Sequence, residues 1–397
     1  MTMTEFVESG PRERILKGEK GWWLLGAGGY AKLADAHLAA DGGLLPQVER
    51  KLRDKDILTV PPYQVYTLTV LTSTDCNLGC GYCFQNTAQD PTGGNRPPRL
   101  EHNRLKPDTT TSILEFASAR MAEAGLDDLS IMLFGGEPLL NPKGCRDLLT
   151  RAKDYGLKYA TMTSNGTLMT PLLSRQLAEL GLTSVQITFD GAREQHDHIR
   201  IRRSGDTGTF DTIVSNIARA SEQTDIRWTL RVNVSHHNYL GIDSLVEQLG
   251  SSLDTSRCTI YFARVGDVGL GYGNELLHTD DLVARFGAWQ RRALQLGFTV
   301  PRPLAHTPCQ TCSFRDGKYG AVVNANGELA SCWETAGKPG WEVGTAADGY
   351  LDSDKTLSRW RTCEDHYQYS ESENVLATFR DRVDAALMDH MSEIGLV

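Results

Sequence analysis

Short apolar runs alternate with longer amphipathic segments between residues 66 and 265. The apolar runs have the length and composition of β-strands. We expect six of them, at residues 66–72, 129–134, 158–164, 184–190, 227–234 and 258–265. The segments between them have helical periodicity, most clearly at residues 109–125, 144–156, 170–181 and 209–222. Such alternation is typical of βαβ units with a parallel sheet. Because six units are fewer than the eight of a closed barrel, we predict an α/β fold with a partial (β/α)6 barrel.

The segment before this core has a different pattern. GWWLLG and GGYAKL predict a hairpin, and residues 44–58 predict an amphipathic helix. The GAGG run at 26–29 lacks the Gly-Lys-Ser/Thr of a phosphate loop, so we interpret it as the hairpin turn. Pro61-Pro62 then predicts a linker.

The sequence pattern changes again after the core. Residues 278–298 and 373–391 predict helices, and Asn326-Gly327 between two strand-like runs predicts a hairpin. We therefore divide the chain into three parts, which are residues 1–62, 63–276 and 277–397.

Composition and charge exclude several classes of protein. Of the 397 residues 40% are hydrophobic, which suits a globular core, and 50 Asp and Glu outnumber 41 Lys and Arg to give a net charge of -9. An acidic chain is a poor general binder of nucleic acid. No apolar run approaches the roughly 18 residues of a membrane span, and the start lacks the apolar region of a signal peptide. We expect a cytoplasmic protein with no nucleic-acid or membrane partner.

Nine cysteines in a reducing compartment suggest metal ligands or packed thiols rather than disulfides. Cys76, Cys80 and Cys83 form a C-x3-C-x2-C loop directly after the first strand of the predicted barrel. Three thiolates can hold three corners of a [4Fe–4S] cubane and leave one iron open to a ligand. A zinc site, or a redox loop with incidental spacing, is the alternative.

Polar and glycine residues end the next strands of the predicted barrel. GGEP begins at Gly135, SNG begins at Ser164, and Asp190-Gly191 follows the fourth strand. A single turn of this kind means only a loop. In a parallel barrel, however, all these strand ends lie at the face that carries the catalytic groups.

The combination of CNLGCGYC, GGEP, SNG and SVQITFDG…HDHIR resembles the radical S-adenosylmethionine (SAM) enzymes, in the branch that includes anaerobic sulfatase-maturating and peptide-modifying enzymes. The resemblance covers residues 66–265. It implies that Cys76, Cys80 and Cys83 bind a [4Fe–4S] cluster. It also implies a set of residues that contact SAM, which are Tyr82, Gly135, Gly136, Glu137, Ser164, Asn165, Asp190, Arg200 and Arg202.

The resemblance gives several of these residues a role. Tyr82 would lie near the adenine, Glu137 with its two glycines would receive the amino group, and Arg200 or Arg202 would meet the carboxylate. SAM would chelate the open iron, and one electron from a donor such as flavodoxin or ferredoxin would release a 5′-deoxyadenosyl radical that takes hydrogen from a substrate.

Four later cysteines, Cys309, Cys312, Cys332 and Cys363, form a second group. The predicted hairpin would return Cys332 toward the first two. The group resembles the SPASM or shorter twitch extension of radical SAM enzymes, but the further C-x2-C run of a full SPASM domain is missing. We expect one auxiliary [4Fe–4S] cluster on all four cysteines; a zinc site or scattered core cysteines are the alternatives. Without Cys363, an open iron could bind substrate.

The leading functional hypothesis is modification of a ribosomally synthesised precursor peptide, by crosslink formation or another C–H oxidation. Residues 1–62 would then bind the leader peptide by strand addition, or would serve only as packing. The alternatives are a dehydrogenase or epimerase of a carbohydrate or other small molecule, a formylglycine-type protein maturase, and a non-enzymatic iron–sulfur or zinc redox regulator.

Overall fold

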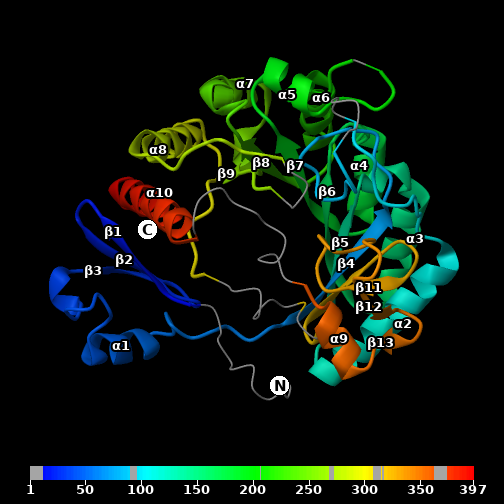
Figure 1. The fold of residues 1–397 in the computed structure, drawn as a ribbon, viewed down its shortest axis with the longest axis horizontal. Helices are drawn as coiled ribbons and strands as arrows, with labels where there is room; N and C mark the ends of the chain where they lie inside the picture. Colours follow the sequence, from blue (N-terminus) through cyan, green and yellow to red (C-terminus); the bar gives the residue numbers. More distant parts are fainter. Residues whose placement is uncertain are drawn as a thin grey trace.

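The computed structural model describes residues 12–89, 96–205, 207–267, 272–306, 314, 317–361 and 373–397. Its main feature is a curved ten-stranded sheet with the order β13-β12-β11-β10-β4-β5-β6-β7-β8-β9 (Figure 1). Six neighbouring strands are parallel and match the predicted runs, namely β4 (Val65–Ser73), β5 (Asp128–Gly135), β6 (Leu157–Ser164), β7 (Leu182–Phe189), β8 (Arg227–Val234) and β9 (Cys258–Arg264). Because β9 and β13 are the two edges, the sheet is an open barrel, as predicted.

Helices pack on the outer face of this sheet (Figure 1). They are α2 (Pro107–Ala124), α3 (Pro142–Ala152), α4 (Pro171–Glu179), α5 (Arg193–Ile199), α6 (Phe210–Ser221), α7 (Ile242–Ser252) and α8 (Asp280–Gln295). Short 3-10 turns are η2 (Asp35–His37), η3 (Pro138–Leu140), η4 (Lys153–Tyr155), η5 (Tyr239–Gly241) and η6 (Thr255–Arg257). Local sequence explains several helix starts: proline opens α2, α3 and α4, and the Thr170 and Thr279 hydroxyls cap α4 and α8.

The predicted hairpin at Asn326-Gly327 is confirmed, and it joins the main sheet. Strand β10 (Gly320–Val323) pairs antiparallel with β11 (Glu328–Ala330) and parallel with β4. Gly327 has a φ of 93°, a conformation that favours glycine. Strands β12 (Glu342–Thr345) and β13 (Gly349–Tyr350) continue the sheet, and α9 (Ser353–Arg359) follows. The sheet therefore crosses the boundary that we placed at residue 276.

The N-terminal segment forms a three-stranded antiparallel sheet of β1 (Arg14–Gly18), β2 (Gly21–Leu25) and β3 (Tyr30–Leu33), followed by α1 (Pro46–Arg53). The sequence predicted the β2–β3 hairpin with its turn at 26–29 and missed β1. Leu24 and Leu33 pack with Leu52 of α1 on one face of the sheet. On the other face, Trp23 packs against Met388 of α10 (Glu373–Glu393). The N-terminal sheet and α10 therefore share one small core, and Figure 1 shows them side by side.

Within the described ranges, no helix is both long enough and apolar enough to cross a membrane.

Candidate active site

The cysteine loop leaves the end of β4 and is held against the end of β5 by the GGEP motif. Gly136 donates its amide to Ser73 O at 2.9 Å, and Glu137 donates its amide to Asp75 O at 2.8 Å. Gly135 has a φ of 136°, and a Cβ atom there would lie 2.0 Å from Ser73 O. Glycine is required at position 135 because this backbone approach leaves no room for a side chain.

Two further segments hold the cysteine loop from its sides. On one side Gly79 donates its amide to Ile201 O at 2.9 Å. On the other side Leu100 donates its amide to Gln85 O at 3.1 Å. The isolated bridges Leu78–Arg202 and Asn86–Arg99 belong to the same two contacts. The loop is therefore fixed by strand-like pairing along much of its length.

The three thiols of this loop suit an iron–sulfur cluster. Cys76 and Cys80 are buried, Cys83 is partly exposed, and none is in a disulfide. With Leu78 and Tyr82 they form an apolar cluster. Burial raises the pKa of the Cys80 thiol to about 12 and also raises the pKa of Cys76, so cluster binding must displace protons here. In the part of the chain that is described, no three His, Cys, Asp or Glu side chains converge as ligands of one metal ion; the thiolates of a cubane bind separate irons.

Glu137 joins the ends of β5 and β6. Its carboxylate accepts hydrogen bonds from the Ser164 hydroxyl at 3.0 and 3.1 Å, from the Asn165 amide at 2.7 Å and from the Leu139 amide at 3.0 Å. The side chain is fully buried, which raises its pKa, while the backbone donors oppose that shift. Both carboxylate oxygens therefore already have protein partners, and a contact with an amino group of SAM stays a prediction.

Asn165 connects the end of β6 to the cysteine loop. Its Nδ2 donates to Asn77 Oδ1 at 2.8 Å and lies 3.8 Å from Cys76 Sγ, while its Oδ1 accepts from the Thr167 hydroxyl at 2.6 Å. The SNG motif is thus placed beside the thiols, as its position after a strand predicted.

The buried Asp190 and Arg200 form a polar cluster with the partly buried Tyr82, two residues after Cys80. The Tyr82 hydroxyl donates to Asp190 Oδ2 at 2.8 Å, and Arg200 Nη1 lies 2.8 Å from the Tyr82 oxygen and 3.2 Å from Asp190 Oδ2. Burial raises the pKa of Asp190, and the Arg200 charge opposes that rise. By contrast, Arg202 Nη2 reaches Thr212 on α6 at 3.5 Å. Of the two arginine candidates, the structure places Arg200 with Tyr82 and Asp190.

Two residues near the site were not predicted from the sequence. Arg99 Nη1 donates to Cys83 Sγ at 3.4 Å. The Tyr272 ring stands edge-on to the Tyr82 ring, with centroids 5.7 Å apart. The ring centroid of His237 lies 6.5 Å from that of Tyr272. Neither Arg99 nor Tyr272 belongs to a motif or a periodic segment, so only their pairing in the fold reveals them.

The second cysteine group is described only in part. Cys332 is buried just after β11, and its amide donates to the Thr335 hydroxyl at 3.2 Å. Cys309, Cys312 and Cys363 lie outside the described residues. The auxiliary cluster therefore stays a prediction.

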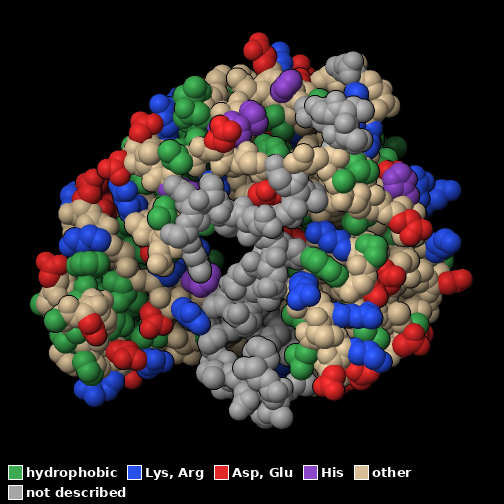
Figure 2. Space-filling view, in the orientation of Figure 1, with side chains coloured by type: hydrophobic (Ala, Val, Ile, Leu, Met, Phe, Trp, Pro, Cys, Tyr) green, Lys and Arg blue, Asp and Glu red, His purple; other side chains and the backbone are tan. Residues whose placement is uncertain are grey.

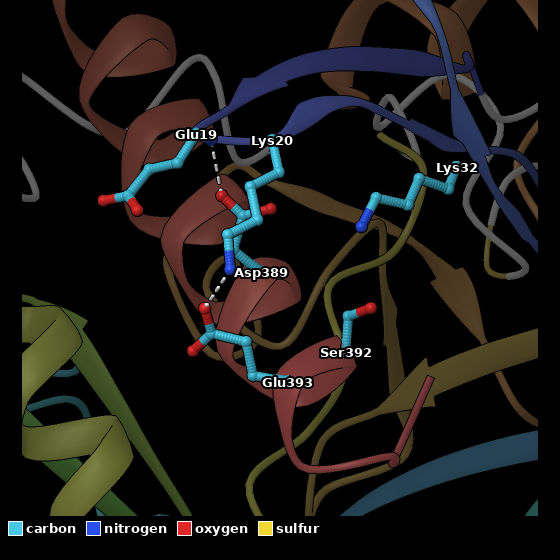
Figure 3. Close-up of a pocket in the computed structure, with 6 residues that line it drawn as sticks. All are labelled: Glu19, Lys20, Lys32, Asp389, Ser392 and Glu393. Carbon is cyan, nitrogen blue, oxygen red and sulfur yellow. Dashed lines mark hydrogen bonds and ion pairs between the residues drawn. The ribbon is translucent and has the colours of Figure 1, made fainter.

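A cavity of 220 Å³ lies elsewhere, between the β1–β2 turn and α10 (Figure 3). An ion pair of 3.0 Å joins Lys20 to Glu393, and Asp389 accepts the Glu19 amide at 2.6 Å. Its other lining residues are Lys32 and Ser392. None of the predicted site residues lines it, so we assign it to the junction of the N-terminal sheet with α10 rather than to catalysis.

Residues 70–248 match the family model described as "Radical SAM superfamily". This segment is a radical SAM domain. It contains the cysteine loop, the GGEP and SNG motifs and the Tyr82 cluster, and it confirms the resemblance of this segment to the radical SAM family. The family implies a [4Fe–4S] cluster and SAM as cofactors, and the thiols of the cysteine loop fit the cluster.

Several curated proteins are similar to part of the chain. It is 26% identical over 214 residues to the Fe-coproporphyrin III synthase of Methanosarcina barkeri, which is 52% of this chain and 45% of that protein. It is 24% identical to the radical SAM cyclopropyl synthase TigE of Paramaledivibacter caminithermalis, over 47% of this chain and 36% of that protein. The PqqA peptide cyclase of Bradyrhizobium diazoefficiens is 25% identical, over 47% of this chain and 43% of that protein. The chain thus spans less than half the length of these relatives.

Solved structures share the fold over more of the chain. "Native anSMEcpe with bound AdoMet" superimposes with a TM-score of 0.61 at 16% identity, over 83% of this chain and 99% of that one. Streptococcus suis SuiB bound to S-adenosylmethionine gives a TM-score of 0.51 at 16% identity, over 89% of each chain. At such low identity these likenesses show the fold alone.

Proposed function

We propose that this protein is a radical SAM enzyme that modifies a ribosomally synthesised peptide, by forming a crosslink or oxidising another C–H position. The observation that carries the proposal is the likeness of the fold to two proteins solved with peptides. These structures are described as anSMEcpe with AdoMet and the Cp18Cys peptide, and SuiB with its precursor peptide SuiA. The partial relatives TigE and PqqA peptide cyclase support the same class of substrate.

Cys76, Cys80 and Cys83 would hold the catalytic [4Fe–4S] cluster. When bound and reduced, the cluster supplies the electron that cleaves SAM to a 5′-deoxyadenosyl radical. The chain itself positions the reactants. Tight pairing of the cysteine loop restricts its motion, and burial of Cys76 and Cys80 keeps water from the thiolates.

The Tyr82–Asp190–Arg200 cluster would orient SAM from the other side of the loop. The Arg200 Nε atom is buried and has no hydrogen-bond partner among the described residues. A buried N–H without a partner costs free energy, so an acceptor from a bound ligand would stabilise it. We assign the methionyl carboxylate of SAM as that acceptor.

The N-terminal sheet offers an edge for a leader peptide. Strand β2 is central, and the β1 edge is partly occupied because Arg12 and His306 exchange backbone hydrogen bonds of 2.7 and 2.9 Å. The remaining edge is β3, beside which hydrophobic side chains gather over the N-terminal sheet and α1 (Figure 2). An extended leader would add a strand there.

Amide hydrogen exchange tests this docking. A bound leader should slow exchange at residues 30–33 of β3, and β1, already paired near Arg12, serves as the internal control. Unchanged exchange across β3 in the presence of saturating peptide would assign residues 1–62 to packing alone.

We also propose one auxiliary [4Fe–4S] cluster on Cys309, Cys312, Cys332 and Cys363, and a protein electron donor such as flavodoxin or ferredoxin. The β10–β11 hairpin, which ends just before Cys332, supports this assignment. After anaerobic reconstitution the protein should bind about eight irons, whereas one cluster needs about four and zinc sites need none.

The central experiment is anaerobic incubation of the reduced protein with SAM and a candidate precursor peptide. Wild type should release 5′-deoxyadenosine and remove two hydrogens from the peptide. Cys80→Ser should abolish both, whereas Cys258→Ser should retain them because Cys258 is a buried thiol at the start of β9, at the opposite end of the parallel strands from the cysteine loop. If 5′-deoxyadenosine does not form in wild type, the protein is not a radical SAM enzyme.

A second candidate is modification of a small molecule, favoured by the similarity to Fe-coproporphyrin III synthase over 52% of the chain. It predicts SAM cleavage that a tetrapyrrole or another small molecule stimulates, with no change in peptide mass.

A further inference from the structure

We propose that Arg99 is a positioning residue for the catalytic cluster, whose guanidinium binds the Cys83 sulfur and whose positive charge makes the bound cluster easier to reduce. This inference rests on the proposed function, because it requires the cluster at Cys76, Cys80 and Cys83. It assigns a role to a residue outside the cysteine, GGEP and SNG motifs.

The guanidinium of Arg99 connects three parts of the loop. Nη1 donates to Cys83 Sγ at 3.4 Å, while Nη2 donates to Gln85 Oε1 at 2.6 Å and to Thr74 O at 3.4 Å. Thr74 precedes the first cysteine and Gln85 follows the last one. Arg99 thereby joins the entry and the exit of the cysteine loop beside one of its sulfurs.

The fold makes room for this side chain. A Cβ atom at Gly136 would lie 2.7 Å from Arg99 Nη2 and 2.3 Å from Asp75 O. Any larger residue at position 136 would push against both. The second glycine of GGEP is therefore explained in this chain by the close approach of Arg99 and the loop backbone.

Two buried polar atoms beside the cysteine loop lack hydrogen-bond partners among the described residues. They are the N–H donors Arg99 Nε and Gln85 Nε2. Buried donors of this kind are normally satisfied. A bound cluster would bring sulfide and thiolate acceptors into this loop, and hydrogen bonds to the sulfurs are one of the factors that set cluster potentials.

The positive charge of Arg99 should raise the reduction potential of the bound cluster. Reduction adds one electron, taken from the protein donor, to a cluster that carries thiolate ligands. A cation beside Cys83 stabilises the more negative, reduced state, and partial burial limits solvent screening. Arg99 itself gains and loses neither electrons nor protons.

The test is the reduction potential of the anaerobically reconstituted cluster, followed by electron paramagnetic resonance in wild type and variants. Arg99→Gln should lower the potential enough to weaken reduction at least tenfold, which is about 59 mV for one electron. Arg99→Lys, with a shorter charged side chain, should give a smaller shift. Arg203→Gln is the matched control because Arg203 also clamps the loop, at Leu78 O and Pro97 O, without touching a sulfur; its potential should equal that of wild type.

Each other outcome has one meaning. An unchanged potential in Arg99→Gln, or an equal shift in Arg203→Gln, overturns the proposal. If Arg99→Gln binds no iron, Arg99→Met, which also removes the charge, decides: a downward shift supports the role and an unchanged potential refutes it. A wild-type protein that binds no cluster removes the proposed function as well, whereas a cluster with insensitive potential removes only the role of Arg99.

Discussion

Removal of Arg200 should destabilise the protein through the charge that it leaves behind. The side chains of Arg200 and Asp190 are only 9% and 2% exposed, and their ion pair is 3.2 Å long. Removing one partner of a buried ion pair lowers the free energy of unfolding by about 3–5 kcal/mol, because the remaining carboxylate keeps its charge without solvent or a cation to balance it. Unfolding entropy of about 2.1 cal/mol/K per residue over 397 residues converts this loss into a Tm lower by roughly 4–6 °C.

The assay compares three variants of the apo protein by thermal and urea unfolding. Arg200→Met should show the full loss. The double variant Asp190→Asn with Arg200→Met should regain at least about 2 kcal/mol, because Asn still accepts the Tyr82 hydroxyl but carries no charge. Arg193→Met is the control: its pair with Asp211 is 2.8 Å long but exposed, and its loss should cost less than about 1 kcal/mol.

The pH dependence provides a second check on the same reasoning. Without Arg200 the pKa of Asp190 should rise further above its ordinary value, so the folded state binds a proton more tightly than the unfolded state. The loss of unfolding free energy caused by Arg200→Met should then be largest near neutral pH and should shrink as the pH falls toward 4. Equal unfolding free energies for the single and double variants at pH 7 would refute the buried-charge argument.

Three further predictions concern other parts of the chain. Asp389→Ala removes the acceptor of Trp23 Nε1 (2.8 Å) and should lower the free energy of unfolding by about 1–3 kcal/mol. The N-terminal sheet and α10 should then be cleaved faster by protease, and an unchanged cleavage rate would contradict this. Gly135→Ala should prevent iron binding in reconstitution, because its Cβ would overlap Ser73 O; a full iron content would show that the loop can move away. Burial holds the pKa of His196 well below its ordinary value, so the unfolding free energy should fall as the pH drops below about 6.5, and His196→Gln should flatten that slope.

The parallel strands of the barrel were predictable because their signal is local. β7 and β8 alternate apolar with polar residues, and β5 is a more continuous apolar run; both patterns predict a strand from neighbouring residues alone, wherever the chain places it. The β10–β11 hairpin was predictable for the same reason, since Asn326-Gly327 suits its turn. Strand β1, with the sequence RILKG, has too short and mixed a pattern, and it becomes a strand only because β2 pairs with it.

The cysteine loop shows the same division. The spacing of Cys76, Cys80 and Cys83 is a property of consecutive residues, so the chain alone predicted a cluster site. The approach of Arg99 to Cys83 depends on pairing between segments 98–100 and 85–87. The packing of β1–β3 on α10 likewise joins elements more than 300 residues apart in the sequence. Periodicity and spacing report neighbours along the chain. Contacts between distant segments arise from the packing free energy of the whole fold, which no single segment carries.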